Sequence, residues 1–316
     1  MTQIILVGIA AGVAGALLFL SPIGGTTLAF PLFTLCGLPI ALAGLGWGAT
    51  SALAAALVAA AILTIALSGS AAIIYLALFA GPIFWMTRLA SLSRQDDPDS
   101  VDVEWYPIGR ILFQGALAAA LGIIIVGFVV GYDPAAITDE MIDALAGWMA
   151  QSPEVAAPPT VADIEPFVRF NVAAMPFTVS AILVIILVFN MWLASRVTEA
   201  SGRLKRPRPA VWTAALPREA VIVLAAAIVV AILAPGAIGQ VAGTFVGALA
   251  AALALVGLAV LHATTFANAM RIPILVTVYV VLIMFGFPIL LLAILGIVET
   301  FIHMRDRRLG GAPPNQ

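Results

Sequence analysis

The sequence predicts an all-α protein, a polytopic transmembrane helical bundle of about ten spans, some of them broken or half-length. Composition is the first reason, because 63% of the 316 residues are hydrophobic, 9% are charged and the mean hydropathy is +1.15. A soluble domain of this length cannot bury so much apolar surface, so lipid must be the solvent. The second reason is a loop at residues 196–218 with six basic residues and one acid between two apolar runs. Short basic loops stay in the cytoplasm and set the direction of the flanking helices.

The N-terminal half is predicted to hold five spans. The first is expected to be a retained helix, because the N-terminal run has no basic n-region and no small-residue cleavage site. Pro31 and the turn at residues 37–39 interrupt the second, which is therefore either one kinked span or two half-length helices. The five spans are predicted at about residues 4–20, 26–45, 47–67, 71–89 and 111–130.

The loops of this half differ in charge. Residues 91–107 carry five acids, but Arg88, Arg94 and Arg110 bracket them, so we predict a cytoplasmic loop. Residues 132–169 carry seven acids and one base, a net charge of −6, and are predicted to be external. Apolar residues at helical spacing in 137–149 indicate a short external amphipathic helix. A second is predicted from a capping box at residues 160–163, and both are expected on the membrane surface.

The C-terminal half is predicted to complete the bundle. Its last apolar run, residues 272–303, is longer than one bilayer crossing at about 1.5 Å per residue. A hairpin at residues 286–288 brings the basic tail, residues 304–316, into the cytoplasm with the N-terminus. We therefore expect one integral domain over residues 1–316 in a bacterial inner membrane, with both termini cytoplasmic. The remaining spans are predicted at about residues 171–193, 221–233, 241–261, and on either side of the hairpin.

Polar residues inside the apolar runs are the first candidates for a binding site. Glu299 lies within the last run, where a carboxylate is costly and normally has a partner. It either pairs with His303 or a nearby arginine, or it contributes to a substrate or coupling site. Asn190, with Trp192 next to it, either forms a helix-to-helix hydrogen bond beside an interfacial anchor or lines a polar cavity.

The other two candidates are cationic. His262 lies near Asn268 and Arg271 in a short polar connection, where it either caps a helix or helps to bind an anion. Arg88, at the end of the fourth span, is the fourth candidate ligand residue, and it also marks a cytoplasmic helix end.

The sequence argues against several classes of function. It contains no HExxH, GxSxG or GxxxxGK[ST] motif, and two histidines with one cysteine, Cys36, cannot form a usual zinc site. We therefore expect no catalysis, metal or cofactor. The net charge of −2 argues against nucleic acid as a partner. Small residues recur at helical spacing in the first, third and eighth spans, which favours close helix packing within the chain or against other membrane proteins.

Several phrases resemble the YybS-like family of uncharacterised bacterial inner-membrane proteins. They are GLPIALAGLGWG at residues 37–48, the arginine-ended fourth span, EWYPIGR at 104–110, GLAVLH at 257–262 and LGIVETFIHMRDR at 295–307. The similarity spans nearly the whole chain. That family has no established activity, but it distantly resembles the substrate-capture subunits of energy-coupling-factor transporters, whose ligands bind near the external side.

Two functions are therefore expected. One is capture or transport of a small molecule or lipid, which the broken helices and intramembrane polar residues support. The other is a non-catalytic structural or assembly role, in which small-residue faces and the basic loop contact other proteins or the lipid bilayer.

Overall fold

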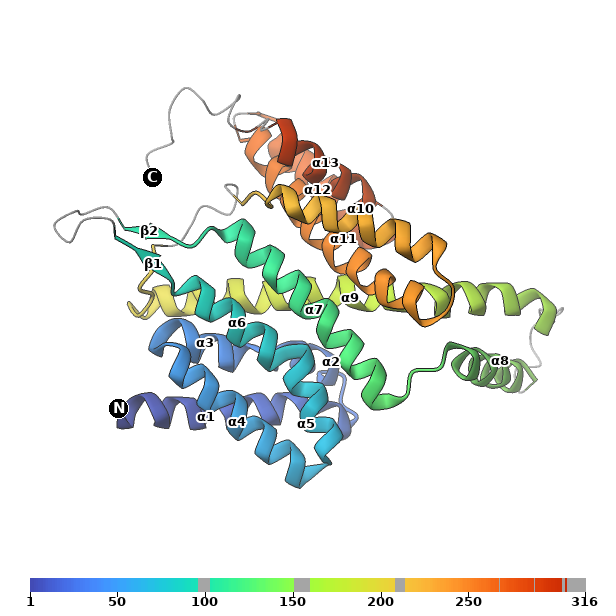
Figure 1. Ribbon diagram of the computed structural model, residues 1–316, viewed down its shortest axis with the longest axis horizontal. Coiled ribbons are helices and arrows are strands. Elements are labelled where there is room, and N and C mark those ends of the chain that lie inside the picture. Colours follow the sequence, from blue (N-terminus) through green and yellow to red (C-terminus); the bar gives the residue numbers. More distant parts are fainter. Residues whose placement is uncertain are drawn as a thin grey trace.

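The computed structural model describes residues 1–95, 103–150, 160–207, 214–266, 268–286, 288–302 and Arg305. The all-α prediction is confirmed, and seven helical segments of the described chain are long and apolar enough to cross a membrane. The chain is thus a multi-pass membrane protein. With the shorter apolar helices α10, α12 and α13, these segments correspond to the ten predicted spans (Figure 1). The elements are α1 (Thr2–Phe19), η1 (Ser21–Gly24), α2 (Ala29–Thr34), α3 (Leu38–Trp47), α4 (Ala49–Ala66), α5 (Gly69–Tyr75), η2 (Leu76–Ala80), α6 (Gly81–Ala90), β1 (Ser93–Arg94), β2 (Glu104–Trp105), α7 (Ile108–Val130), α8 (Pro134–Ala150), α9 (Val161–Ala200), α10 (Arg218–Leu233), α11 (Ala237–Thr264), α12 (Arg271–Phe285) and α13 (Pro288–Ile302).

Helices α1 and α4 pack closely through their small-residue faces. A Cβ atom added at Gly8 would lie 2.7 Å from the backbone oxygen of Ser51, and one added at Gly12 would lie 2.6 Å from that of Ala55. The Ser51 hydroxyl also donates a hydrogen bond to the carbonyl of Ile4 at 3.0 Å. Because apolar burial drives no association within lipid, such close contact supplies the attraction instead. The small-residue faces of α1 and α4 therefore contact each other within the chain.

The second span consists of two half-length helices, α2 and α3, so the structure decides between the two alternatives. Between them the backbone carbonyls lack regular helical donors. Asn190 of α9 donates a hydrogen bond to the carbonyl of Thr34 at 2.8 Å, and the Tyr75 hydroxyl donates one to that of Cys36 at 3.2 Å. Irregular backbone is tolerated at such depth because the protein itself satisfies its polar groups.

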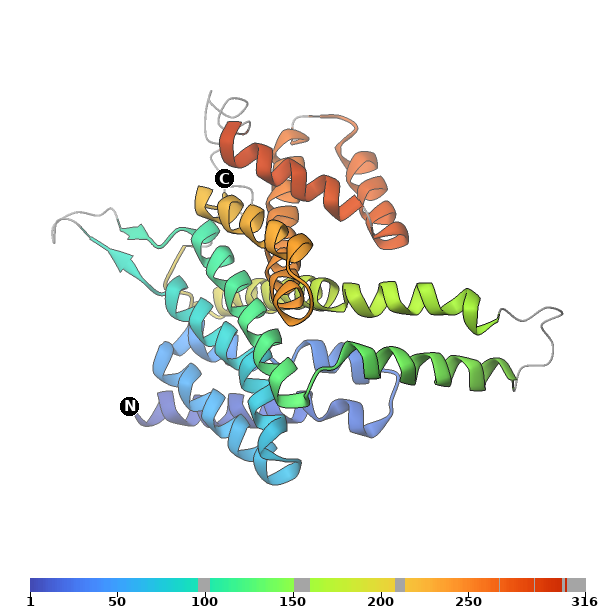
Figure 2. The same cartoon turned by 45° about the vertical axis from the view of Figure 1, so that its right-hand side comes forward.

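The polar segments differ from the predictions in two respects. Residues on both sides of 96–102 form a short antiparallel hairpin, with Ser93 opposite Trp105, where a plain loop was expected. The prediction of a separate second amphipathic helix is wrong, because the capping box of Thr160 and Asp163 begins the 40-residue helix α9, which continues through the sixth span. Helix α8 and the first part of α9 project together from the bundle in Figure 2.

The last apolar run is divided as predicted. Helix α12 ends at Gly286, whose φ of +66° lies in the left-handed region that glycine adopts without steric cost. The chain then folds back into α13, so that the two helices diverge from a common corner (Figure 2). Helix α13 packs on α11, which is buried along most of its length at the centre of this half.

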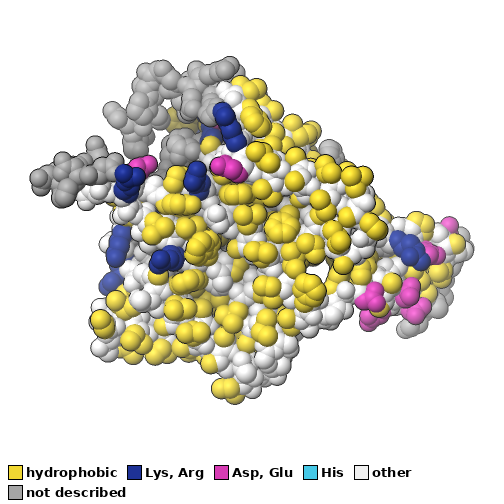
Figure 3. All heavy atoms as spheres, viewed as in Figure 1, with side chains coloured by type: hydrophobic (Ala, Val, Ile, Leu, Met, Phe, Trp, Pro, Cys, Tyr) yellow, Lys and Arg dark blue, Asp and Glu magenta, His cyan; other side chains and the backbone are white. Residues whose placement is uncertain are grey.

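Charge is segregated between the two ends of the bundle. In Figure 3, most lysine and arginine side chains gather on the side of the β1–β2 hairpin, and a cluster of acids with one arginine covers the α8 end. A hydrophobic surface lies between them. This separation matches the loop charges on which the predicted orientation depends. Which end faces the cytoplasm stays a prediction.

Candidate functional site

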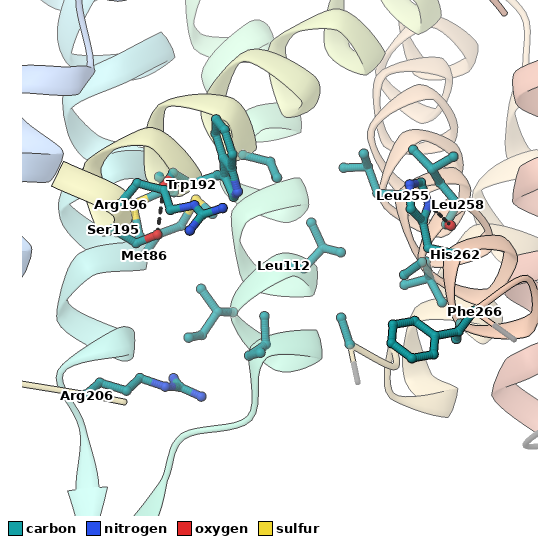
Figure 4. Close-up of a pocket in the computed structure, with 18 of the residues that line it drawn as sticks. Met86, Leu112, Trp192, Ser195, Arg196, Arg206, Leu255, Leu258, His262 and Phe266 are labelled. Atoms are coloured by element: carbon teal, nitrogen blue, oxygen red, sulfur yellow. Dashed lines mark hydrogen bonds between the residues drawn. The ribbon is translucent and has the colours of Figure 1, made fainter. Parts of the chain in front are cut away.

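A cavity of about 710 Å³ lies between α7 and α9 on one side and α11 and α12 on the other (Figure 4). It is at the end of the bundle that carries the β1–β2 hairpin, because it takes the first residues of α7 and the last residues of α9 and α11. Most of its wall is aliphatic. The apolar lining residues are Met86, Ile108, Ile111, Leu112, Val188, Met191, Ala214, Leu255, Val256, Leu258, Ala259 and Ala263.

Three arginines reach this cavity from different elements: Arg196 from α9, Arg206 from the following loop, and Arg271 from the start of α12. Among the described residues that line it there is no aspartate or glutamate. Within the described part of the chain, none of the three forms an ion pair with a carboxylate. The cavity therefore combines apolar walls with positive charge that no described acidic side chain of its lining neutralises.

Each arginine is oriented by contacts with uncharged groups. Arg196 lies over the ring of Trp192 at 5.7 Å and Arg271 over that of Phe266 at 4.8 Å. Arg206 donates a hydrogen bond from Nη1 to the carbonyl of Tyr106 at 2.8 Å. Aromatic faces attract cations and hold a guanidinium without removing its charge. These contacts leave N–H groups of each guanidinium available for a ligand.

The basic loop that carries Arg206 is anchored at its start. Arg203 stacks over the ring of Trp47 at the end of α3, 4.6 Å from its centre. Partial burial lowers the pKa of Arg206 below its ordinary value. A guanidinium nevertheless stays protonated at neutral pH, so the positive charge is retained. The loop is thus held against the N-terminal half of the bundle, at Trp47 and Tyr106, and places a cation at the cavity.

His262 faces the cavity from α11, on the opposite side from Arg196 and Arg206 (Figure 4). Its Nδ1 is 2.9 Å from the carbonyl of Leu258, so Nδ1 carries the proton and donates it. Nε2 is then an acceptor for the Tyr279 hydroxyl of α12, at 3.5 Å. The histidine links α11 to α12. Arg271 lines the same cavity, whereas Asn268 is engaged in the local turn through the amide of Met270.

The other three predicted residues lie outside this cavity. Asn190 is fully buried at the α2–α3 break, and its Oδ1 has no hydrogen-bond partner among the described residues. Glu299 accepts a hydrogen bond from Nε of Arg305 at 2.7 Å, and both side chains are buried. Arg88 is exposed on α6. His303 lies outside the described residues. Of the four candidates, the structure therefore brings only His262 to the cavity.

Arg196 and Arg206 were not named as site residues from the sequence, because their loop was interpreted as a topology signal and as a surface for other proteins or lipid. The available clue was the spacing of Trp192 and Arg196, one helical turn apart, which places both on one face of α9. Arg271 was recognised as a possible partner of His262. Which of these residues share one cavity depends on distances between elements that lie far apart in the sequence.

No described group of three or more His, Cys, Asp or Glu residues could hold a metal ion. Comparisons with protein-family models, with curated proteins and with solved structures found no match. The chain is therefore classified by its fold alone, as a multi-pass helical membrane protein with an arginine-lined cavity.

Proposed function

We propose that this protein captures an anionic membrane lipid without catalysing a reaction on it. A phosphate headgroup would bind Arg196, Arg206 and Arg271, and an acyl or isoprenoid chain would lie along the aliphatic wall. The observation that carries this proposal is that three arginines, and no acid among the described residues, line a largely aliphatic cavity of about 710 Å³. Sites of about 300–1,000 Å³ with few convergent polar groups are typical of small ligands.

The energetics favour an anionic ligand. Charged groups next to apolar walls lose hydration, and an opposite charge offsets that cost best where water is scarce. Arginine also presents a planar array of N–H donors that binds two phosphate oxygens at once. A headgroup with no net charge would leave the three cations uncompensated.

The distant resemblance to substrate-capture subunits of energy-coupling-factor transporters also implies a binding role. The proposal departs from that resemblance in one respect, because this cavity lies at the end of the basic loop rather than near the acidic end. The structural or assembly alternative is less supported. Its small-residue faces on α1 and α4 contact each other within the chain, so they are not open to a partner.

Thermal unfolding of the purified protein tests the proposal. We expect phosphatidylglycerol to raise the unfolding temperature, because a ligand that binds only the folded state stabilises it. Phosphatidylcholine should have little effect because it has no net charge, and inorganic phosphate should have little effect because it has no acyl chain. Arg206→Gln, Arg196→Gln and Arg271→Gln should each weaken phosphatidylglycerol binding by about tenfold to a hundredfold, corresponding to about 1.5–3 kcal/mol per charged hydrogen bond.

Arg88→Gln is the matched control, because Arg88 is exposed and does not line the cavity. Its binding should equal that of the wild type. Equal loss in Arg88→Gln and Arg206→Gln would indicate general surface electrostatics and contradict the proposed site. An effect of inorganic phosphate as large as that of the lipid would identify a free anion as the ligand.

A further inference from the structure

A second cavity, of about 280 Å³, lies at the opposite end of the same helices. It is lined by residues within 123–130 of α7, 175–179 of α9 and 237–244 of α11, whereas the arginine-lined cavity is lined by residues within 108–112, 188–196 and 255–263 of these helices. At about 1.5 Å per residue, the two are separated by about 15 Å of packed helix. Both cavities therefore lie along one seam, formed by α7, α9 and α11.

The second cavity contains uncharged polar groups. Pro176 of α9 has no N–H, so the carbonyl of Val172 lacks its helical donor, and the Tyr132 hydroxyl supplies a hydrogen bond at 3.2 Å instead. Gln240 of α11 also lines this cavity, and no hydrogen bond of its side-chain amide to another described residue is present. An amide and a phenol can hold a headgroup, but more weakly than three arginines.

The packed segment between the cavities combines buried alanines of α7 and α11 with larger side chains of α9, namely Leu183, Val184 and Leu187. Ala119 and Ala120 of α7 and Ala248 and Ala252 of α11 are fully buried, and α7 contacts α11 directly. At Gly247, α11 approaches α9 so closely that an added Cβ would overlap the carbonyl of Phe177. Such faces are held together by close van der Waals contact rather than by a hydrophobic drive. Once these helices part, the small side chains of α7 and α11 leave room for a headgroup between them.

We propose that the α7–α9–α11 seam is a transbilayer path for the anionic lipid, with the arginine-lined cavity at one end and the Gln240 cavity at the other. This inference rests on the proposed capture function and extends it from binding to movement. The headgroup passes between the parted helices while the chain remains in the bilayer. No bond forms or breaks, so the lipid moves in either direction, down its own gradient.

A reversible crosslink across the seam provides the test. A Cβ atom at Gly243 would lie 4.0 Å from that of Pro176, within the range of about 3.5–4.5 Å that a disulfide spans. The double variant Pro176→Cys/Gly243→Cys therefore joins α9 to α11 when oxidised. Its reduced form is the matched control, and the native Cys36 is buried.

The protein is reconstituted in phosphatidylcholine vesicles with a short-chain fluorescent phosphatidylglycerol, and fatty-acid-free serum albumin then extracts the labelled lipid from the outer leaflet. We expect movement of the lipid with the wild type, and movement slower by about tenfold or more with the oxidised variant than with the same variant when reduced. Both forms should bind phosphatidylglycerol equally in the thermal assay.

The other outcomes decide the two proposals separately. Equal movement in both redox states would overturn the seam as the path, as would failure of the two cysteines to form a disulfide. Binding without any movement would overturn the path and leave capture intact. Absence of binding in the wild type would overturn both.

Discussion

The pair formed by Glu299 and Arg305 provides a structural reason for a carboxylate inside an apolar run. Their side chains are only 3% and 7% exposed, so the pair lies away from water. A buried ion pair adds little net stability to the folded protein, because the cost of desolvating both charges offsets most of their attraction. Removing only one partner is costly, because it leaves the other charge buried and uncompensated. The pair is therefore expected to be sensitive to single substitutions and tolerant of a joint one.

We predict that Glu299→Gln lowers the free energy of unfolding. Removing one partner of a buried ion pair costs about 3–5 kcal/mol, and we expect a loss at the lower end of this range because the amide still accepts a hydrogen bond. Glu299→Gln/Arg305→Met should regain most of this loss, because neither charge remains. Thermal unfolding of the three proteins measures both effects. If Glu299→Gln unfolds like the wild type but no longer binds phosphatidylglycerol, the carboxylate has a binding role that its geometry does not reveal.

Reasoning from the sequence was sufficient to identify the buried polar residues but not their partners. It recognised that Glu299 needs a partner and that Asn190 is suited to a helix-to-helix hydrogen bond. It could not find the arginine cavity, because Arg196, Arg206 and Arg271 are brought together by the packing of α9 against α11. Basic residues at a membrane surface have the same appearance in the sequence whether they orient a helix or bind a ligand.

Among the elements, α11 depends most on the absence of side chains. A Cβ atom at Gly257 would overlap the backbone oxygen of Leu292 on α13, and one at Gly296 would overlap that of Leu253. These glycines let the two helices lie in direct backbone contact. Because α11 also forms one wall of the arginine-lined cavity, its position against α13 affects the site.

Gly257→Ala should destabilise the protein by about 1–3 kcal/mol or more, because an inserted methyl group forces the two backbones apart. Gly243→Ala on the same helix is the control, since its methyl group would meet the Cβ of Pro176 at an ordinary 4.0 Å. Denaturation midpoints of both variants in detergent compare the effects. Similar midpoints for the two would show that α11 and α13 are not in such close contact.

Local chemistry explains which elements the sequence could predict. Proline and glycine interrupt helical hydrogen bonding, so the α2–α3 break and the α12–α13 turn were both recognised. The continuity of α9 was not, because its amphipathic first turns and its apolar span have different compositions. Pro166 and Pro176 lie within this one helix. The β1–β2 hairpin has only two residues per strand and too little periodicity to be recognised.

For the whole molecule, the bundle separates charge and places a cavity at each end of one seam. The basic end holds the arginine-lined cavity, and the acidic α8 end lies nearest the uncharged one. If the basic end is cytoplasmic, as its loop charge predicts, the lipid is captured from the cytoplasmic leaflet, where arginine-rich surfaces attract anionic lipids. The central claim is that this lipid occupies the cavity itself rather than the outer surface.

Photocrosslinking with a phosphatidylglycerol analogue that carries a diazirine near its headgroup tests that claim most directly. The protein is illuminated in vesicles, digested and analysed by mass spectrometry to locate the modified residues. We expect modification of the cavity-lining parts of α9 and α11, residues 188–196 and 255–263, and its loss in Arg206→Gln. Modification confined to the lipid-facing surfaces of helices such as α1 and α4, unchanged by Arg206→Gln, would contradict it.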